Sequence, residues 1–275
     1  MVKDIHPSSY SSNPSWLTNV NGTLFFGAVD GTHGVELWKS DGTEAGTVMV
    51  KDISPSSTSS GPRYLTNIDG VLFFNAWDET HGRELWKSDG TEAGTVMVKD
   101  INPGAAASMP EDQSFEFTIT SMNGPLFFTA DDGVHGRELW KSDGTEAGTV
   151  MVKDIHPSWG WPKNLTNVDG TLFFAADDNI NGLELWKSDG TETGTVMVGD
   201  LLAGQAGSEP EELTNVNGTL FFISWSSYSI YEKQLWTSDG TQAGTFVVKH
   251  IDSDVASLSN GPGVVFEFSQ KGGHG

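Results

Sequence analysis

The sequence contains no cysteine, few basic residues and no long apolar run. Without cysteine, neither a disulfide nor a thiolate zinc site can form. Only 15 Lys and Arg stand against 37 Asp and Glu, which gives a formal net charge of −22. Phosphate binding needs clustered cations, so nucleic acid is not expected as a partner. No apolar run approaches the roughly 18 residues of a membrane span, so membrane insertion is not expected either.

The sequence contains an internal repeat. The tetrapeptide SDGT occurs five times at intervals of about 50 residues, a period typical of propellers and solenoids. Each unit reads as four short segments rich in β-branched and aromatic residues, in the first unit "WLTNV", "TLFFGAV", "VELWKS" and "TVMVKDI". We therefore predict an all-β protein, a β-propeller of four-stranded antiparallel blades in one domain spanning 1–275. The repeat units are approximately 6–53, 54–101, 102–155, 156–201 and 202–251.

The turns and the repeated tryptophan have structural explanations. An Asn-Gly or Asp-Gly pair such as Asn21-Gly22 joins the first two strands of every unit and is typical of a type I′ hairpin. In the SDGT turn, Asp and Thr side chains can accept hydrogen bonds from the turn backbone. A tryptophan recurs in the third strand of every unit, as at Trp38, and is expected to pack between blades.

The two ends of the chain suggest an additional blade. Residues 1–5 resemble a fourth strand, and residues 258–268 resemble a first and second strand. We predict that both termini join in a composite sixth blade; the alternative is a ring of five. Because the first residues already belong to the repeat, no signal peptide is expected, and the chain would be a mature form or a piece of a longer array.

The repeat "ELWKSDGTEAGT", present in three units and varied in two, resembles that of the ELWxxDGT repeat proteins. These are mostly long bacterial chains that are secreted or attached to the cell surface. The resemblance implies an extracellular or cell-surface location. It implies little about activity, because the function of that family is poorly defined.

Strand direction sorts the loops onto two faces of the propeller. The tight turns lie on one face, while the loops between the second and third strands and the blade-to-blade links lie on the other. This second face carries a repeated D-x-x-H-G-x-E pattern, which either forms small polar sites or caps the loop. The pattern comprises Asp30, His33 and Glu36; Asp78, His81 and Glu84; and Asp132, His135 and Glu138.

Aromatic residues outside the repeat pattern form the second group of candidates. They could stack on sugar rings while neighbouring polar groups bind hydroxyls, or they could pack the loops onto the blades. The candidate ligand-binding residues are Trp16, Tyr64, Trp77, Trp159, Trp161 and Trp225, with Arg83 and Arg137 beside them and Tyr228 and Tyr231 in a nearby loop.

These patterns favour binding over catalysis. Catalysis needs unlike groups that converge on one point, whereas most carboxylates here recur around a ring. We predict a non-catalytic, carbohydrate-binding (lectin-like) module with a glycan as its partner. The alternatives are an extracellular scaffold for protein interaction or adhesion and, less favoured, a glycosidase-like enzyme. No cofactor is expected, although calcium on the carboxylates is left open.

Overall fold

The computed structural model describes residues 1–55, 57–109, 119–227 and 232–249, and contains five four-stranded sheets. We call these sheets blades 1 to 5 in chain order. Blade 1 holds β1 (Ser15–Val20), β2 (Thr23–Val29), β3 (Val35–Ser40) and β4 (Val48–Lys51); blade 2 holds β5 (Arg63–Ile68), β6 (Val71–Asp78), β7 (Gly82–Ser88) and β8 (Val96–Lys99); blade 3 holds β9 (Thr120–Ser121), β10 (Leu126–Asp131), β11 (Arg137–Ser142) and β12 (Val150–Lys153); blade 4 holds β13 (Lys163–Val168), β14 (Thr171–Asp177), β15 (Leu183–Ser188) and β16 (Val196–Met197); blade 5 holds β17 (Glu211–Val216), β18 (Thr219–Ser227), β19 (Glu232–Ser238) and β20 (Phe246–Lys249).

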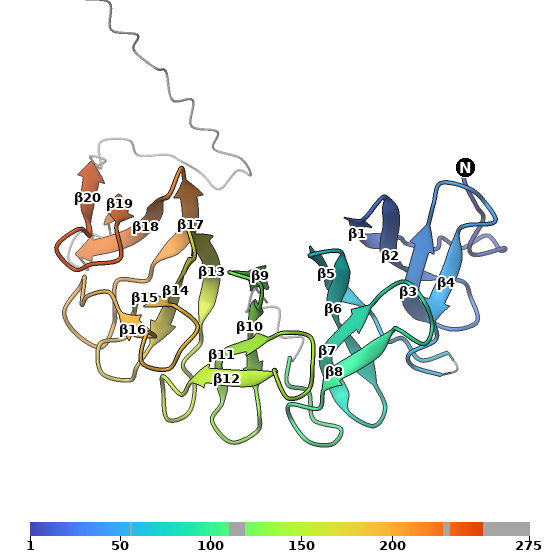
Figure 1. The fold of residues 1–275 in the computed structure, drawn as a ribbon, viewed down its shortest axis with the longest axis horizontal. Helices are drawn as coiled ribbons and strands as arrows, with labels where there is room; N and C mark the ends of the chain where they lie inside the picture. The colour runs from blue at the N-terminus through green and yellow to red at the C-terminus, as the bar shows by residue number, and fades with distance from the viewer. Residues whose placement is uncertain (56, 110–118, 228–231, 250–275) are drawn as a thin grey trace, which may run out of the picture.

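Within each blade the strands lie in chain order, and each pairs antiparallel with the next. The five blades stand side by side in an open arc, with β1, β5, β9, β13 and β17 along its concave side (Figure 1). An all-β fold of four-stranded antiparallel blades is therefore confirmed. The described residues do not close a ring, so the number of blades stays a prediction.

The predicted turns are present in the structure. Asn21 and Gly22 both have positive φ, 50° and 85°, as a type I′ hairpin requires. In the SDGT turn, Asp41 Oδ1 accepts hydrogen bonds from the backbone N and the Oγ1 of Thr43, at 2.9 and 2.7 Å. The repeated aspartate of this turn is thus structural, as expected.

The apolar core lies between neighbouring blades. Trp86 of blade 2 is 6% exposed and packs with Phe25 and Leu37 of blade 1, and equivalent clusters fill the next three junctions. Burying a large apolar side chain stabilises a fold by about 1.5–3 kcal/mol, so these junctions hold the blades together. The prediction that the repeated tryptophan packs between blades is confirmed.

Repeated lysines add polar bonds across the same junctions. Lys39 Nζ donates to the carbonyl of Gly90 at 2.8 Å, and Lys51 Nζ donates to the carbonyl of Thr95 at 2.9 Å. Both carbonyls belong to the SDGT turn region of the next blade. Blades 1, 2 and 3 are therefore each joined to the next blade by apolar packing and by lysine–carbonyl hydrogen bonds.

The last blade exposes the face that earlier blades bury. Val50 of blade 1 is 6% exposed, whereas Val248 at the same place in blade 5 is 45% exposed. Val20 and Val216 differ in the same way, at 6% and 40%. The cause is position, because no described blade follows blade 5.

The predicted strand over Met1–Ile5 is absent. A strand needs a neighbour for its ladder, and the third strand of the proposed composite blade has no counterpart in the sequence. The segment still follows the repeat in one respect: Lys3 Nζ donates to the carbonyl of Thr47 at 2.8 Å, as Lys51 does to Thr95. Residues 258–268, the other part of that blade, lie outside the described residues.

Candidate functional site

The chain provides its own comparison, because the five blades share one repeat. The first three strands of the blades differ from one another at only a few positions. Where all copies agree, the blade architecture explains the residue; where they differ, it does not. The differing positions lie where a first strand begins, where a second strand ends and where a third strand begins, which is the face of the blade links. Every described cation outside the repeated positions lies there: Arg63, Arg83, Arg137, Lys163 and Lys233.

Two candidate aromatics, one at the start of the first strand of blade 1 and one at the start of the first strand of blade 2, contact each other. The ring centroids of Trp16 in β1 and Tyr64 in β5 are 4.6 Å apart, and the ring planes are tilted by 47°. Their φ angles are 56° and 54°, because each residue sits in an irregularity of its strand ladder. Trp16 is 42% exposed, so the pair presents an open aromatic surface.

The conformation of this aromatic pair is strained. Positive φ is tolerated best by Gly, Asn and Asp, and a bulky residue there costs about 1 kcal/mol or more. Blades 4 and 5 adopt the same φ with Asn164 (60°) and Glu212 (54°). The architecture therefore sets the backbone, but it does not require an aromatic side chain. A strained, exposed and non-repeated aromatic is a mark of function rather than of folding.

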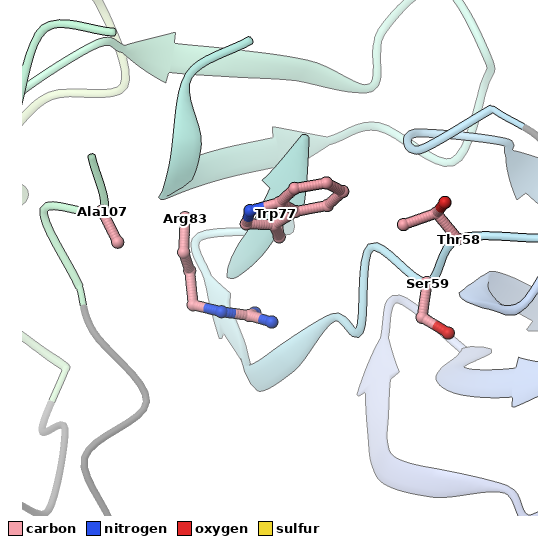
Figure 2. Close-up of a pocket in the computed structure, with 5 residues that line it drawn as sticks. All are labelled: Thr58, Ser59, Trp77, Arg83 and Ala107. Atoms are coloured by element: carbon pink, nitrogen blue, oxygen red, sulfur yellow. The ribbon is translucent and has the colours of Figure 1, made fainter. Parts of the chain in front are cut away.

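A pocket opens on the same face over blade 2. It has a volume of about 350 Å3 and is lined by Thr58, Ser59, Trp77, Arg83 and Ala107 (Figure 2). Trp77 and Arg83 are cross-strand partners in β6 and β7, so their side chains share one face of the sheet. Thr58 and Ser59 come from the link before blade 2, and Ala107 comes from the link after it.

The Asp–His pairs form local caps, one in each of blades 1 to 3. Asp78 Oδ1 accepts from the backbone N of Thr80 and of His81, both at 2.8 Å, and Asp78 Oδ2 lies 2.9 Å from His81 Nδ1. The hydrogen bond to Asp78 raises the pKa of His81. Burial raises the pKa of Asp78, but the hydrogen bonds from His81 outweigh it and lower the pKa overall. The same contacts recur for Asp30 with His33 and for Asp132 with His135.

The glutamates grouped with these pairs have a separate structural role, which was not predicted from the sequence: they bind the backbone of the links between blades. Glu84 is fully buried and accepts hydrogen bonds from Ile101 N (3.2 Å), Ser108 N (3.1 Å) and Ser108 Oγ (2.6 Å), all in the link to blade 3. Burial raises its pKa to about 7, against the lowering effect of these bonds. The sequence signal for this role was the position of the glutamate, two residues before the repeated tryptophan in the motif ELW. The same arrangement recurs at Glu36 with Ile53 and Ser60, Glu138 with Ile155 and Gly160, and Glu184 with Leu201 and Ser208.

The remaining candidates are not brought together. Trp159 and Trp161 lie in the link between blades 3 and 4, 53% and 44% exposed. Trp225 lies in β18 of blade 5, and Arg137 opens β11 of blade 3. Tyr228 and Tyr231 lie outside the described residues. None of these findings tests ligand binding, so the site assignments stay predictions.

Among the described residues, no group of three or more His, Asp or Glu side chains could hold a metal ion. No helix in the described part of the chain is long and apolar enough to cross a bilayer.

No protein-family model matches the sequence, and no curated protein matches it either. Solved structures do match. Puromycin hydrolase, as a mutant complexed with PGG, matches with a TM-score of 0.52 and 15% identity over 90% of this chain and 40% of that chain. A prolyl endopeptidase structure matches with a TM-score of 0.49 and 12% identity over 86% and 34%. Oligopeptidase B from Leishmania major matches with a TM-score of 0.48 and 13% identity over 86% and 33%.

These matches correct the predicted function. The structure that matches with a TM-score of 0.52 is a puromycin hydrolase, so the prediction of a carbohydrate-binding module is wrong by this comparison. Its alternatives, an adhesion scaffold and a glycosidase-like enzyme, gain no support. At such low identity the likeness shows a propeller-type fold alone, and the chain spans 40% or less of these three proteins. The resemblance to ELWxxDGT repeat proteins and the extracellular location stay predictions.

Proposed function

We propose that this chain is a peptide-binding propeller domain with no catalytic group of its own. The observation that carries the proposal is the Trp16–Tyr64 pair, which is strained, exposed and required by no feature of the blade. The pair lies on the same face as the pocket of blade 2 and the non-repeated cations. This face is the binding surface.

A peptide offers groups that suit each part of this surface. Its apolar side chains can pack on the aromatic rings, its carboxylates can pair with arginine or lysine, and its backbone can hydrogen bond to the polar links. The repeated lysines bond across the blade junctions, as Lys39 and Lys51 do. The non-repeated cations lie instead on the face of the blade links, which adds positive charge to the proposed binding surface.

The absence of a catalytic role rests on how the polar groups are used. Catalysis requires unlike groups that converge on one point. The described Asp–His pairs cap separate loops on separate blades, and the buried glutamates hold the links. Hydrolysis of a bound peptide, if it accompanies this domain, belongs to groups outside the described residues.

Ring closure belongs to the same proposal. We propose that a composite sixth blade closes the ring against blade 5, where Val216 and Val248 are exposed, as the next blade covers this face elsewhere. A chain that ends at residue 249 is expected to expose more apolar surface, measured as increased binding of a hydrophobic dye. Unchanged dye binding would contradict closure by a sixth blade.

The peptide-binding test compares two variants by fluorescence anisotropy with a library of labelled peptides. A Trp16→Asn and Tyr64→Asn double variant keeps the backbone conformation, because Asn164 has it naturally. Loss of two stacked aromatic contacts is expected to weaken binding at least about tenfold, equivalent to about 1.4 kcal/mol.

Phe246→Ala is the matched control, because it removes an exposed aromatic side chain beside an SDGT turn, on the opposite face. It is expected to leave peptide affinity unchanged. Failure of the folded wild-type protein to bind any peptide would refute the proposed function. Equal affinity of the double variant and the wild type would refute the assigned surface.

A further inference from the structure

Blade 1 stands at one end of the arc and has an open face there (Figure 1). Leu17 is 61% exposed on this face, whereas Leu65 at the same place in blade 2 is 8% exposed. Lys39 of blade 1 lies against Gly90 of blade 2 and donates to its carbonyl at 2.8 Å. Gly42, the equivalent of Gly90 in blade 1, has no such neighbour among the described residues. Blade 1 therefore lacks the contacts that it makes itself on blade 2.

The junction between blades 1 and 2 shows what covers such a face. Blade 1 contributes one apolar residue from each of its strands and one from the link, namely Val20, Phe25, Leu37, Val50 and Ile53. Leu37 comes from β3, and so does Lys39, two residues later on the same side of the strand. The third strand thus brings both an apolar side chain and a lysine to the next blade.

Residues 1–5 already occupy the place of a preceding fourth strand. Their sequence, MVKDI, repeats that of residues 49–53. Ile5 packs on the apolar cluster of blade 1, and Lys3 Nζ donates to the carbonyl of Thr47 at 2.8 Å. These are contacts that a fourth strand makes at the other junctions, but no described third strand lies beside the segment.

The glutamate of a third strand holds the link that follows its blade. Glu36 accepts hydrogen bonds from Ile53 N at 3.0 Å, from Ser60 N at 2.9 Å and from Ser60 Oγ at 2.6 Å. Glu84 and Glu184 bind the same two places in their own links. A third strand therefore supplies a carboxylate to the link as well as side chains to the next blade.

The link before blade 1 has the same donors without the carboxylate. Ile5 and Ser12 stand at the places of Ile53 and Ser60. The carbonyl of Ser12 accepts a hydrogen bond from Val29 N at 3.0 Å, as the carbonyl of Ser60 does from the next blade at 2.9 Å. Among the described residues, no carboxylate accepts from Ile5 N, Ser12 N or Ser12 Oγ. The donors that bind a third-strand glutamate are therefore in position.

The chain itself has no third strand left for this place. The segment ELWK occurs four times and QLWT once, and each lies in the third strand of its own blade. Within residues 1–275, no further copy remains for the open face of blade 1. The chemistry of the missing strand follows from the contacts that the other third strands make.

We propose that the open face of blade 1 docks an extended segment of a partner protein with the pattern Glu-Leu-x-Lys. The segment adds a strand beside residues 1–5. Its glutamate accepts hydrogen bonds from Ile5 and Ser12. Its leucine packs with Leu17, and its lysine donates to the carbonyl of Gly42. This docking site lies beyond the proposed peptide-binding surface and provides the third strand of the composite sixth blade.

The first experiment uses the labelled peptide VELWKSDG, the sequence of residues 35–42, and measures its binding to the protein by fluorescence anisotropy. A peptide with glutamine in place of the glutamate, or in place of the lysine, is expected to bind at least about fivefold more weakly, because each change removes a charge-assisted hydrogen bond. A scrambled peptide of the same composition is the control. No binding by the folded protein, or equal binding of the scrambled peptide, would overturn the proposal.

The second experiment changes the open face. Leu17→Ser removes its apolar contact and is expected to weaken binding of the peptide at least about tenfold. The matched control is Ile180→Ser, in a loop of blade 4, where the isoleucine is 70% exposed. This control is expected to keep the wild-type affinity. Circular dichroism establishes that both variants are folded, and equal affinity of the two would contradict the assigned face.

The third experiment isolates the contact with the glutamate. Ser12→Ala removes the hydroxyl donor and is expected to weaken binding of VELWKSDG at least about threefold, with a smaller effect on the glutamine peptide. Ser9→Ala, an exposed serine of the same link, is the control and is expected to change neither affinity. An equal effect of Ser12→Ala on both peptides would show that the glutamate does not bind at this place.

A second copy of the chain is the competing occupant of this face. Sedimentation velocity without peptide distinguishes the two. A monomer supports docking of a partner segment. A dimer that Leu17→Ser dissociates would assign the face to a second copy and overturn the proposal.

Discussion

Blades 2 and 5 are built from the same repeat but carry different side chains where the chain enters the blade. Both have four antiparallel strands, an SDGT turn and a core tryptophan in the third strand. At the entering link, however, blade 2 has Gly61 and Arg63, whereas blade 5 has Glu209 and Glu211. A pocket lies beside Trp77 and Arg83 in blade 2, and in blade 5 Glu211 pairs with Lys233 and Glu209 accepts a hydrogen bond from Trp225.

The backbone is nearly the same in both blades at these positions. Tyr64 and Glu212 have the same φ of 54°, although one side chain is aromatic and the other is an acid. The conformation is therefore imposed by the blade and not by the residue that occupies it. Side chains at such positions can change without changing the fold, which makes them available for binding.

The largest effect is expected from the glutamate that holds the link of blade 2. Glu84→Ala leaves buried donors of Ile101 and Ser108 without their acceptor, at a cost of about 3 kcal/mol or more in the free energy of unfolding. Urea denaturation measures this change. Glu79→Ala, in the exposed loop of the same blade, is the control and should alter stability by less than about 0.5 kcal/mol. Equal effects of the two variants would contradict the assigned role.

The same glutamates predict how stability depends on pH. Burial raises the pKa of Glu84 from 4.5 to about 7, so the folded state keeps a proton that the unfolded chain releases between these values. This contribution is complete below pH 4.5 and is lost as pH rises through 7, by roughly 1–3 kcal/mol per carboxyl. The raised pKa of His81 acts in the same direction.

Thermal unfolding followed by circular dichroism at about pH 5 and about pH 8 tests this dependence. The midpoint should be higher at the lower pH. Glu84→Gln gives blade 2 the amide that blade 5 has at Gln234, and it should reduce the difference. A midpoint that rises with pH would show that these carboxyls are ionised in the folded state.

The smallest effect concerns the strained tryptophan of blade 1. Trp16→Asn places at φ 56° a residue that tolerates this conformation, as Asn164 does in blade 4. Stability should rise by about 0.5–1 kcal/mol while peptide affinity falls. Denaturation and anisotropy on the same preparation measure both. A variant that is less stable would indicate that the ring pair with Tyr64 contributes more to folding than the strain costs.

Repeated features were predictable, and features of a single blade were not. The hairpin at Asn21-Gly22 and the packing of Trp86 follow from turn chemistry and strand pattern, which act locally or recur in every blade. The predicted strand at residues 1–5 is absent, and no described strand lies beside that segment to form a ladder with it. The sequence also grouped Glu84 with Asp78 and His81, although the glutamate faces the link and the other two cap a loop.

That Trp16, Tyr64, Trp77 and Arg83 bind a ligand stays a prediction. Which of these side chains meet could not be predicted from the sequence, because that depends on the register between strands and on the packing of adjacent blades. The structure places Trp16 against Tyr64 and Trp77 beside Arg83. The predicted glycan ligand is wrong by the comparison with a known structure, and a peptide is proposed in its place.

By itself, the sequence determined the unit: four strands, two turn types and the side chains that join one blade to the next, because these depend on contacts that recur at every junction. The tertiary structure decided what happens at the places where the copies differ. It brought Trp16 to Tyr64 and Trp77 to Arg83, and it placed Glu209 against Trp225 and Glu211 against Lys233 in blade 5. The physical reason is that binding depends on distances between side chains from different strands and links, and only the packed blades set these distances.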